Sequence, residues 1–156
     1  MEIVFARLDE RLVHGQVMTS WAKYFQIKKI IICDDDLVKD SFTCEVLSLA
    51  APSGVVVVVK NVEDTLKQIA SDDTFTKTML LFKNLKYVLS LVEGGFDLKR
   101  INIGNMGSSP SRNELNRRVF MSTDEKEIVK KIQDKGIDIY LQMLYTDPEV
   151  SIDHYL

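Results

Sequence analysis

Most of what can be predicted about this chain follows from the stretch Arg7-Leu8-Asp9-Glu10-Arg11-Leu12-Val13-His14-Gly15-Gln16. It comes directly after the apolar run Ile3-Val4-Phe5-Ala6, which is typical of a first β-strand, and before a segment with helical periodicity. His14 therefore lies at the turn between a predicted strand and a predicted helix. In an open α/β sheet such a turn lies at the carboxyl ends of the strands, where ligands bind and reactions take place. We therefore regard His14 as the first candidate for a chemical role.

The rest of the chain alternates between apolar, β-branched runs and helical segments. Strands are predicted at residues 3–8, 29–33, 55–60, 79–82, 101–103, 119–122 and 137–143. Helices are predicted at residues 16–25, 37–50, 61–70, 85–93 and 123–135. Residues 104–118 are rich in glycine, serine and asparagine, and we expect a long loop with one helical turn there. This alternation predicts an α/β fold: one three-layer α/β/α domain over residues 1–156, with a mostly parallel central sheet of about six to seven strands.

Polar residues mark the starts of several predicted helices. Asn61 and Asn84 are placed to cap two of them, and Ser122 with Glu125 has the spacing of a capping box. The acidic run Asp34-Asp35-Asp36 suits the start of the helix predicted at 37–50. These signals set the helix boundaries independently of the apolar pattern.

The composition excludes several classes of function. Apolar residues make up 46% of the chain and charged residues 28%, which is typical of a globular protein. The net charge of −3 argues against a nucleic-acid-binding surface. The longest aliphatic run, residues 55–59, is far shorter than the roughly 20 residues of a membrane span, and the amino terminus lacks the features of a signal peptide. Cys33 and Cys44 have no metal-ligand spacing, so we expect buried free thiols in a reducing cytoplasm, with no metal and no cofactor.

His14 can act as a nucleophile that carries a phosphoryl group. A neutral imidazole is nucleophilic near pH 7, and we expect His14 to sit on an exposed turn. The phosphate would need donors and positive charge around it. The backbone N–H groups at the predicted helix start could supply the donors; they belong to Gly15, Gln16 and Val17. Arg11 offers a planar fork suited to phosphate oxygens, and Asp9 is placed to orient Arg11.

Other interpretations of the same residues remain open at this point. A lone histidine at a helix start is more often a surface or capping group than a catalyst. A nucleotide-binding Rossmann-like enzyme would have a glycine-rich fingerprint in the first turn, whereas residues 8–15 contain one glycine. A hydrolase using histidine as acid or base would need a serine or aspartate partner, which the spacing does not assign. A non-catalytic regulatory or adaptor domain is a further alternative.

Taken together, several motifs resemble one bacterial family. The run of residues 7–17 followed by Trp21 is similar to the signature of IIB subunits of the mannose/fructose/sorbose class of the phosphoenolpyruvate-dependent sugar phosphotransferase system. Further similar segments are residues 50–55, 80–84, 102–107 and 115–118. The resemblance covers essentially all 156 residues, and its Arg-Leu-x-His-Gly-Gln core is fairly specific.

The resemblance implies a phosphotransferase that works as a cytoplasmic phosphohistidine carrier. His14 would accept a phosphoryl group from the IIA protein and pass it to a hexose-type sugar taken up through the membrane subunits IIC and IID. The protein would then associate peripherally with the inner face of the membrane. The match carries a phosphate-stabilising role to Arg11 and a supporting role to Asp9, and it makes the two cysteines unnecessary as acceptors. The chain would work as a subunit separate from IIA.

The loop of residues 108–111 departs from the family pattern. Its sequence Ser-Ser-Pro-Ser stands where family members often have more glycine and basic residues. The resemblance therefore assigns no role to this loop or to the neighbouring Arg112.

Overall fold

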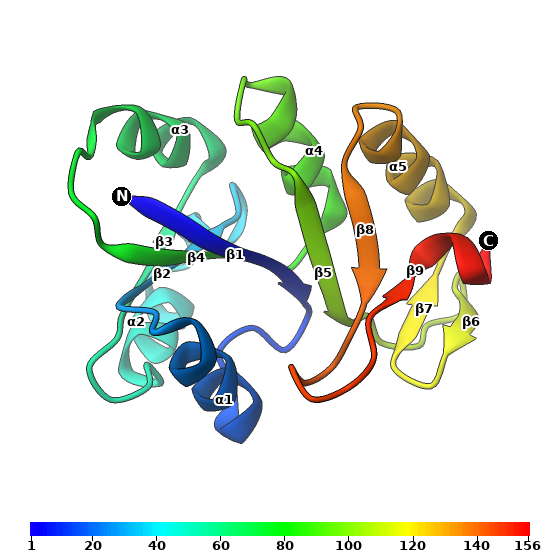
Figure 1. Cartoon of the computed structure of the whole chain (residues 1–156), viewed down its shortest axis with the longest axis horizontal. Helices are drawn as coiled ribbons and strands as arrows, with labels where there is room; N and C mark the ends of the chain where they lie inside the picture. Colours follow the sequence, from blue (N-terminus) through cyan, green and yellow to red (C-terminus); the bar gives the residue numbers. More distant parts are fainter.

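The computed structural model describes the whole chain, residues 1–156. Its centre is a seven-stranded sheet with the strand order β3-β2-β4-β1-β5-β8-β9 (Figure 1). The strands are β1 (Glu2–Asp9), β2 (Lys29–Cys33), β3 (Val56–Lys60), β4 (Lys77–Phe82), β5 (Arg100–Asn105), β8 (Asp138–Leu141) and β9 (Val150–Ser151). Neighbouring strands are parallel, except that β9 runs antiparallel to β8. The predicted, mostly parallel sheet is confirmed.

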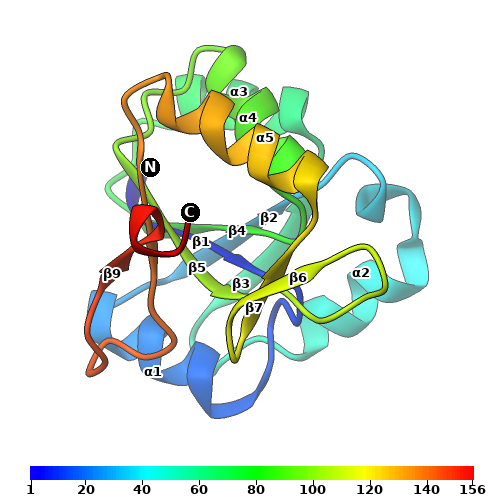
Figure 2. The same ribbon diagram turned by 90° about the vertical axis from the view of Figure 1, so that its right-hand side faces the viewer.

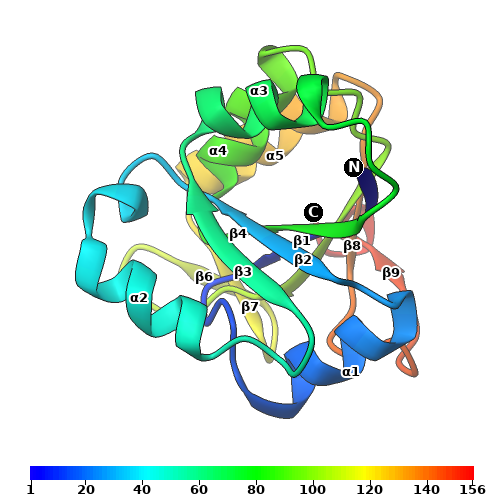
Figure 3. The same ribbon diagram turned by 90° about the vertical axis from the view of Figure 1, so that its left-hand side faces the viewer.

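Helices cover both faces of this sheet, as the views from its two ends show (Figures 2 and 3). One face carries α1 (Gly15–Phe25) and α2 (Ser41–Leu49), and the other carries α3 (Val62–Ser71), α4 (Leu85–Glu93) and α5 (Thr123–Gln133). None of these helices is both long and apolar enough to cross a membrane. The three layers are the fold class that the alternation of strands and helices predicts.

The sheet separates two apolar cores because successive side chains of a strand point to opposite faces. In β4, Leu80 and Phe82 enter the core that contains residues of α4 and α5, whereas Met79 and Leu81 enter the core that contains residues of α1. All four side chains are fully buried. A strand covered on both faces appears in the sequence as an unbroken apolar run, which is why these strands were predictable.

The predicted caps are present. The side chain of Asn61 accepts a hydrogen bond from the backbone of Asp64, and that of Asn84 accepts one from Lys86. Ser122 and Glu125 form a complete capping box, in which each side chain accepts a hydrogen bond from the other residue's backbone N–H. These local bonds satisfy backbone donors at the helix starts, and they fix the starts close to the predicted positions.

The helix predicted at residues 37–50 is wrong in part. The chain forms a short 3₁₀ helix, η1 (Leu37–Lys39), and then begins again as α2. Asp40 causes the break, since its carboxylate accepts hydrogen bonds from both the backbone and the hydroxyl of Thr43 and so caps a new helix.

The single loop predicted at residues 104–118 is also wrong. It contains β6 (Asn113–Asn116), which pairs antiparallel with β7 (Val119–Met121) in a separate two-stranded sheet. Asn116 makes the hairpin turn because its side-chain oxygen accepts hydrogen bonds from the backbone of Arg118 and Val119. The strand predicted at 119–122 therefore lies outside the central sheet, and β9 provides the seventh strand instead.

Candidate functional site

The turn that contains His14 lies at the switch point of the sheet. β1 and β5 are neighbours, but β1 leads into α1 on one face whereas the chain after β5 continues through the hairpin into α5 on the other face. Ligand sites of open α/β sheets form where the connections diverge in this way. Within the turn, Leu12 has a left-handed backbone with φ of 58° and donates its N–H to the carbonyl of Asp9 over 2.9 Å. Non-glycine residues held in this region gather at functional sites.

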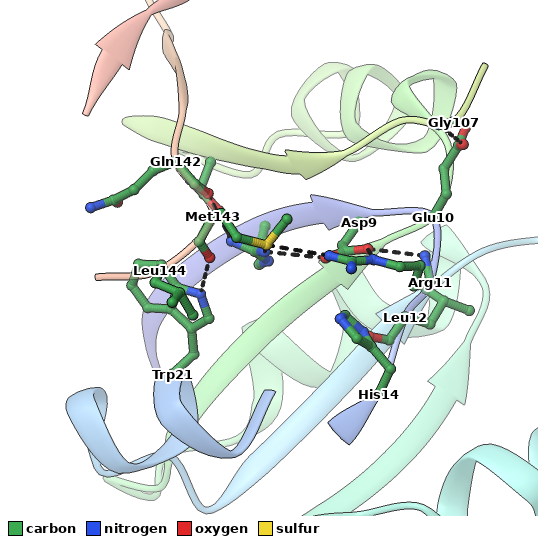
Figure 4. A network of polar contacts seen from close by, with 12 residues as sticks. Asp9, Glu10, Arg11, Leu12, His14, Trp21, Gly107, Gln142, Met143 and Leu144 are labelled. Atoms are coloured by element: carbon green, nitrogen blue, oxygen red, sulfur yellow. Dashed lines mark hydrogen bonds and ion pairs between the residues drawn. The ribbon is translucent and has the colours of Figure 1, made fainter. Parts of the chain in front are cut away.

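Asp9 binds the two arginines of the site (Figure 4). It is fully buried at the end of β1. Its Oδ1 accepts hydrogen bonds from the backbone N and from Nε of Arg11, at 3.0 and 3.1 Å. Its Oδ2 accepts bonds from Nη2 of Arg11 and Nη2 of Arg7, both at 3.1 Å. The carboxylate therefore lies between two guanidinium groups and holds both.

Arg11 keeps one edge of its guanidinium free. Nε and Nη2 bind Asp9, and Nη2 also lies 3.4 Å from the sulfur of Met143. Nη1 donates to no protein group, and the side chain is 36% exposed. An arginine held on one side and open on the other can present donors to a phosphate without first losing side-chain entropy.

Arg7 is a site residue that the sequence interpretation missed. Its side chain is fully buried, with Nη1 donating to the side chain of Asn102 and to the carbonyl of Gln142. Burial lowers the pKa of Arg7, and the charge of Asp9 partly offsets this effect. The available signal was a charged residue inside the apolar run of β1, where it has to be paired to be buried.

Gly104 makes room for Arg7. A Cβ atom built on Gly104 would lie 2.8 Å from Nε of Arg7 and nearer still to Nη2. We therefore expect Gly104→Ala to lower the free energy of unfolding by about 1–3 kcal/mol, the usual cost of overpacking. Urea denaturation monitored by circular dichroism measures this loss. The urea concentration at the midpoint of unfolding should fall, while the dependence of the free energy of unfolding on urea concentration stays unchanged.

Gly107→Ala is the matched control for this prediction. A Cβ on Gly107 would meet its nearest neighbour, Oε1 of Glu10, at an ordinary contact distance of 3.5 Å. It should therefore shift the midpoint far less. Equal midpoints for the two variants would show that Gly104 is not required to seat Arg7.

His14 is the residue before the first turn of α1, and its ring is already engaged. Nδ1 lies 2.8 Å from the carbonyl oxygen of Leu12. A carbonyl oxygen only accepts, so Nδ1 is the donor in this bond. Nε2 is covered by protein and has no hydrogen-bond partner. The turn is exposed as expected, since Arg11, Gly15 and Gln16 are exposed, but the side chain of His14 itself is half-buried.

The start of α1 presents backbone donors beside this histidine. The first N–H of the helix to be bonded within it is that of Met18, which donates to the carbonyl of His14. The N–H groups of Gly15, Gln16 and Val17 precede it, and the side chain of His14 caps none of them. A Cβ on Gly15 would meet nothing within 4 Å, and Gly15 and Gln16 are exposed, so no other part of the chain crowds the helix start at Gly15.

The segment after β8, which contains Met143 and Tyr145, packs against α1 beside the site. Trp21 of α1 donates its indole N–H to the carbonyl of Met143 over 3.0 Å. Tyr145 stacks on Tyr24 of α1, with ring centroids 4.5 Å apart. The Trp21 bond holds Met143 beside α1, where its sulfur contacts Nη2 of Arg11.

The larger cavities of the molecule do not include His14 or Arg11, and two of them border the site. One of about 730 Å³ is at the amino-terminal edge of the sheet and is lined by residues such as Ile27, Val55 and Lys77. Smaller cavities of about 260 and 370 Å³ reach the carboxyl edge, and neither His14 nor Arg11 lines them. Glu10 lines the cavity of about 370 Å³, and Gly104 and Met143 line that of about 260 Å³.

The two cysteines differ in burial. Cys33 is buried, and burial raises the pKa of its thiol to about 11. Cys44 is only partly buried, contrary to expectation, and its thiol donates to the carbonyl of Leu37 over 3.3 Å. Burial also raises the pKa of Cys44. Neither thiol has the lowered pKa of a nucleophilic cysteine.

Comparison with known proteins identifies the family. The family model "PTS system sorbose subfamily IIB component" matches residues 3–156. The sorbose-specific EIIB component of Klebsiella pneumoniae is 33% identical over 97% of this chain and 93% of its own length. The mannose-specific EIIAB component of Escherichia coli is 34% identical over 97% of this chain, which spans 47% of that longer protein.

Solved structures agree with these sequence matches. The crystal structure of the IIBSor domain of the Klebsiella pneumoniae sorbose permease superimposes with a TM-score of 0.91, at 33% identity over 97% of this chain and 94% of the other. The fold, the motif at residues 7–17 and the full-length match therefore agree, and the nucleotide-binding alternative is set aside. This chain belongs to the sorbose subfamily of IIB components of the sugar phosphotransferase system, and its role is phosphoryl transfer in sugar uptake.

Proposed function

We propose that this protein is a phosphohistidine carrier, with His14 accepting a phosphoryl group from phospho-IIA and donating it to a hexose-type sugar during uptake through IIC and IID. The observation that carries the proposal is the arrangement at the end of β1. There a histidine, a clamped arginine with one free edge, and the open start of a helix share one turn (Figure 4). These are a nucleophile and the donors that a phosphate needs.

The chemistry consists of two displacements at phosphorus. In the first, the lone pair of an unprotonated His14 nitrogen forms the new N–P bond, and the N–P bond to the IIA histidine breaks, returning an electron pair to that ring. In the second, a sugar hydroxyl attacks phosphorus, loses its proton to water, and the bond to His14 breaks. One difficult transfer is thereby divided into two easier ones.

Charge stabilisation would come from two directions. Arg11 would bind the phosphoryl oxygens through its free Nη1, while Asp9 keeps the guanidinium oriented. The N–H groups of Gly15, Gln16 and Val17 would supply backbone donors. Most of the catalysis of phosphoryl transfer is positioning and charge stabilisation of this kind.

The partners we propose are IIA as donor and IIC with IID as the membrane acceptor. An Escherichia coli relative is named an EIIAB component, and this chain matches about half of it. We propose that residues 1–156 form one IIB phosphocarrier domain, cytoplasmic and peripherally bound at the membrane through IIC and IID. The exposed residues on either side of His14, which are Arg11, Gly15 and Gln16, support transfer between protein surfaces.

A two-stage experiment tests this function. The protein is first incubated with phosphoenolpyruvate, Enzyme I, HPr and a cognate IIA, and we expect one acid-labile phosphoryl group per chain. The purified phosphoprotein is then mixed with free hexoses, with or without membranes that contain the matching IIC and IID. We expect sugar phosphate only with the membranes. Rapid sugar phosphorylation by the phosphoprotein alone would contradict the carrier function and would indicate a sugar site in this chain.

A further inference from the structure

Arg112, to which the family resemblance assigns no role, uses every donor that it has. Nε and Nη2 bind the carboxylate of Glu125 at 2.8 and 2.7 Å. Nη1 and Nη2 bind the carboxylate of Glu10 at 3.0 and 2.6 Å. The fifth donor, on Nη1, binds the carbonyl of Gly107 at 2.7 Å. A guanidinium has five N–H donors, so Arg112 has none left for a phosphate.

These bonds join three segments that are distant in sequence. Glu10 belongs to the turn between Asp9 and Arg11, and it also accepts the N–H of Gly107 over 2.7 Å. Glu125 closes the capping box of α5. Arg112 thus connects the reactive turn to the loop after β5 and to the start of a helix, and only 16% of its side chain is exposed.

Glu10 would be an unfavourable neighbour if it were free. A phosphoryl group carries negative charge, and an unpaired carboxylate on the same turn as Arg11 would repel that group through space. In the structure both oxygens of Glu10 are occupied by Arg112. The two carboxylates raise the pKa of Arg112, Glu10 contributing most, so the neutralising charge is permanent.

We propose, building on the carrier function above, that Arg112 is a positioning residue for phosphoryl transfer: it holds and neutralises Glu10, so that this carboxylate does not repel the phosphoryl group. Arg112 does not touch the reacting atoms. It acts through Glu10, and the consequence of losing it should be an electrostatic one that removal of the Glu10 charge reverses.

The test measures single-turnover transfer from phospho-IIA to this protein for Arg112→Met and for the double variant Arg112→Met/Glu10→Gln. We expect the single variant to be about tenfold slower than wild type, the effect of a modest charge repulsion in the transition state. The double variant should recover most of the rate, because the unpaired carboxylate is gone. A purely structural role would make the double variant no faster than the single one.

Arg100 provides a matched control. It also bridges two carboxylates, Glu149 at 3.0 Å and Asp138 at 3.2 Å, but it lies at the amino end of β5, away from the reactive turn. Arg100→Met should therefore transfer at the wild-type rate. Thermal unfolding of all variants separates loss of folding from loss of transfer. Should Arg112→Met fail to fold, Arg112→Gln with and without Glu10→Gln gives the same comparison.

Each outcome decides one question. If wild-type protein accepts no phosphoryl group, the carrier function fails. If wild type is labelled but Arg112→Met transfers as fast as Arg100→Met, the role of Arg112 is wrong while the carrier function stands. If Arg112→Met is slow and Glu10→Gln does not restore it, Arg112 supports the fold and does not mask a charge.

Discussion

His14→Ala is expected to reduce phosphoryl acceptance from phospho-IIA to background, the largest effect that any single substitution here should have. The methyl group of alanine has no lone pair to form the N–P bond, so the covalent intermediate cannot form. The fold should persist, since His14 makes no side-chain cap of α1. Acid-labile radiolabel per chain, after incubation with phosphoenolpyruvate, Enzyme I, HPr and IIA, measures the result.

His154→Ala is the control for that experiment. This second histidine is exposed in η2 (Ile152–Tyr155), and its ring contacts Tyr155. We expect the His154→Ala variant to accept as much label per chain as wild type. Undiminished labelling of His14→Ala would overturn the assignment of the acceptor. Wild-type protein that accepts no label at all would favour the regulatory or adaptor alternative for this fold.

Arg11→Ala is expected to slow transfer on the order of 10²-fold while leaving the acceptor intact, as removal of a charge-stabilising donor does in other enzymes. The side chain is partly exposed, and its remaining protein contacts are to Asp9 and Met143. Loss of the Arg11 side chain should therefore lower the free energy of unfolding only slightly. Rapid-quench measurement of the labelling rate, with the final extent of labelling as internal reference, separates a slow transfer from a missing acceptor.

Arg11→Lys should recover only part of this loss. An ammonium keeps the positive charge but cannot bind Asp9 with two parallel bonds and still offer a free planar edge. Wild-type rates in Arg11→Ala would remove Arg11 from the site. A large drop in its melting temperature would instead show that the Asp9–Arg11 pair is structural.

The sequence alone determined the fold class, because the signals that specify it are local. Strands buried on both faces are unbroken apolar runs, and the side-chain caps at Asn61, Asn84 and Ser122 act within three residues. Where prediction failed, local side-chain bonds competed with the apolar pattern. Asp40 began a new helix in place of a continuous one, and Asn116 made a hairpin in place of a loop.

The part of the candidate site that lies within one turn of the chain was predictable from the sequence. His14, Arg11 and Asp9 lie within six consecutive residues, so a motif brings them together. The environment of the histidine was not predictable. Nδ1 is hydrogen-bonded to the carbonyl of Leu12, a leucine with a left-handed backbone for which the sequence carries no signal, and Nε2 is covered by protein.

Only the tertiary structure decided what supports that turn. The side chain of Arg7 binds Asn102, which is 95 residues later in the sequence, and it occupies the space beside Gly104 that a larger residue would fill. Arg112 binds Glu10, which is 102 residues earlier. Polar contacts at such separations leave no periodicity and no fixed spacing in a sequence. They form because parallel strands bring their carboxyl ends to one edge of the sheet. There Asp9 of the same strand neutralises Arg7 while the distant Asn102 accepts a hydrogen bond from its Nη1, and the distant Glu10 neutralises Arg112.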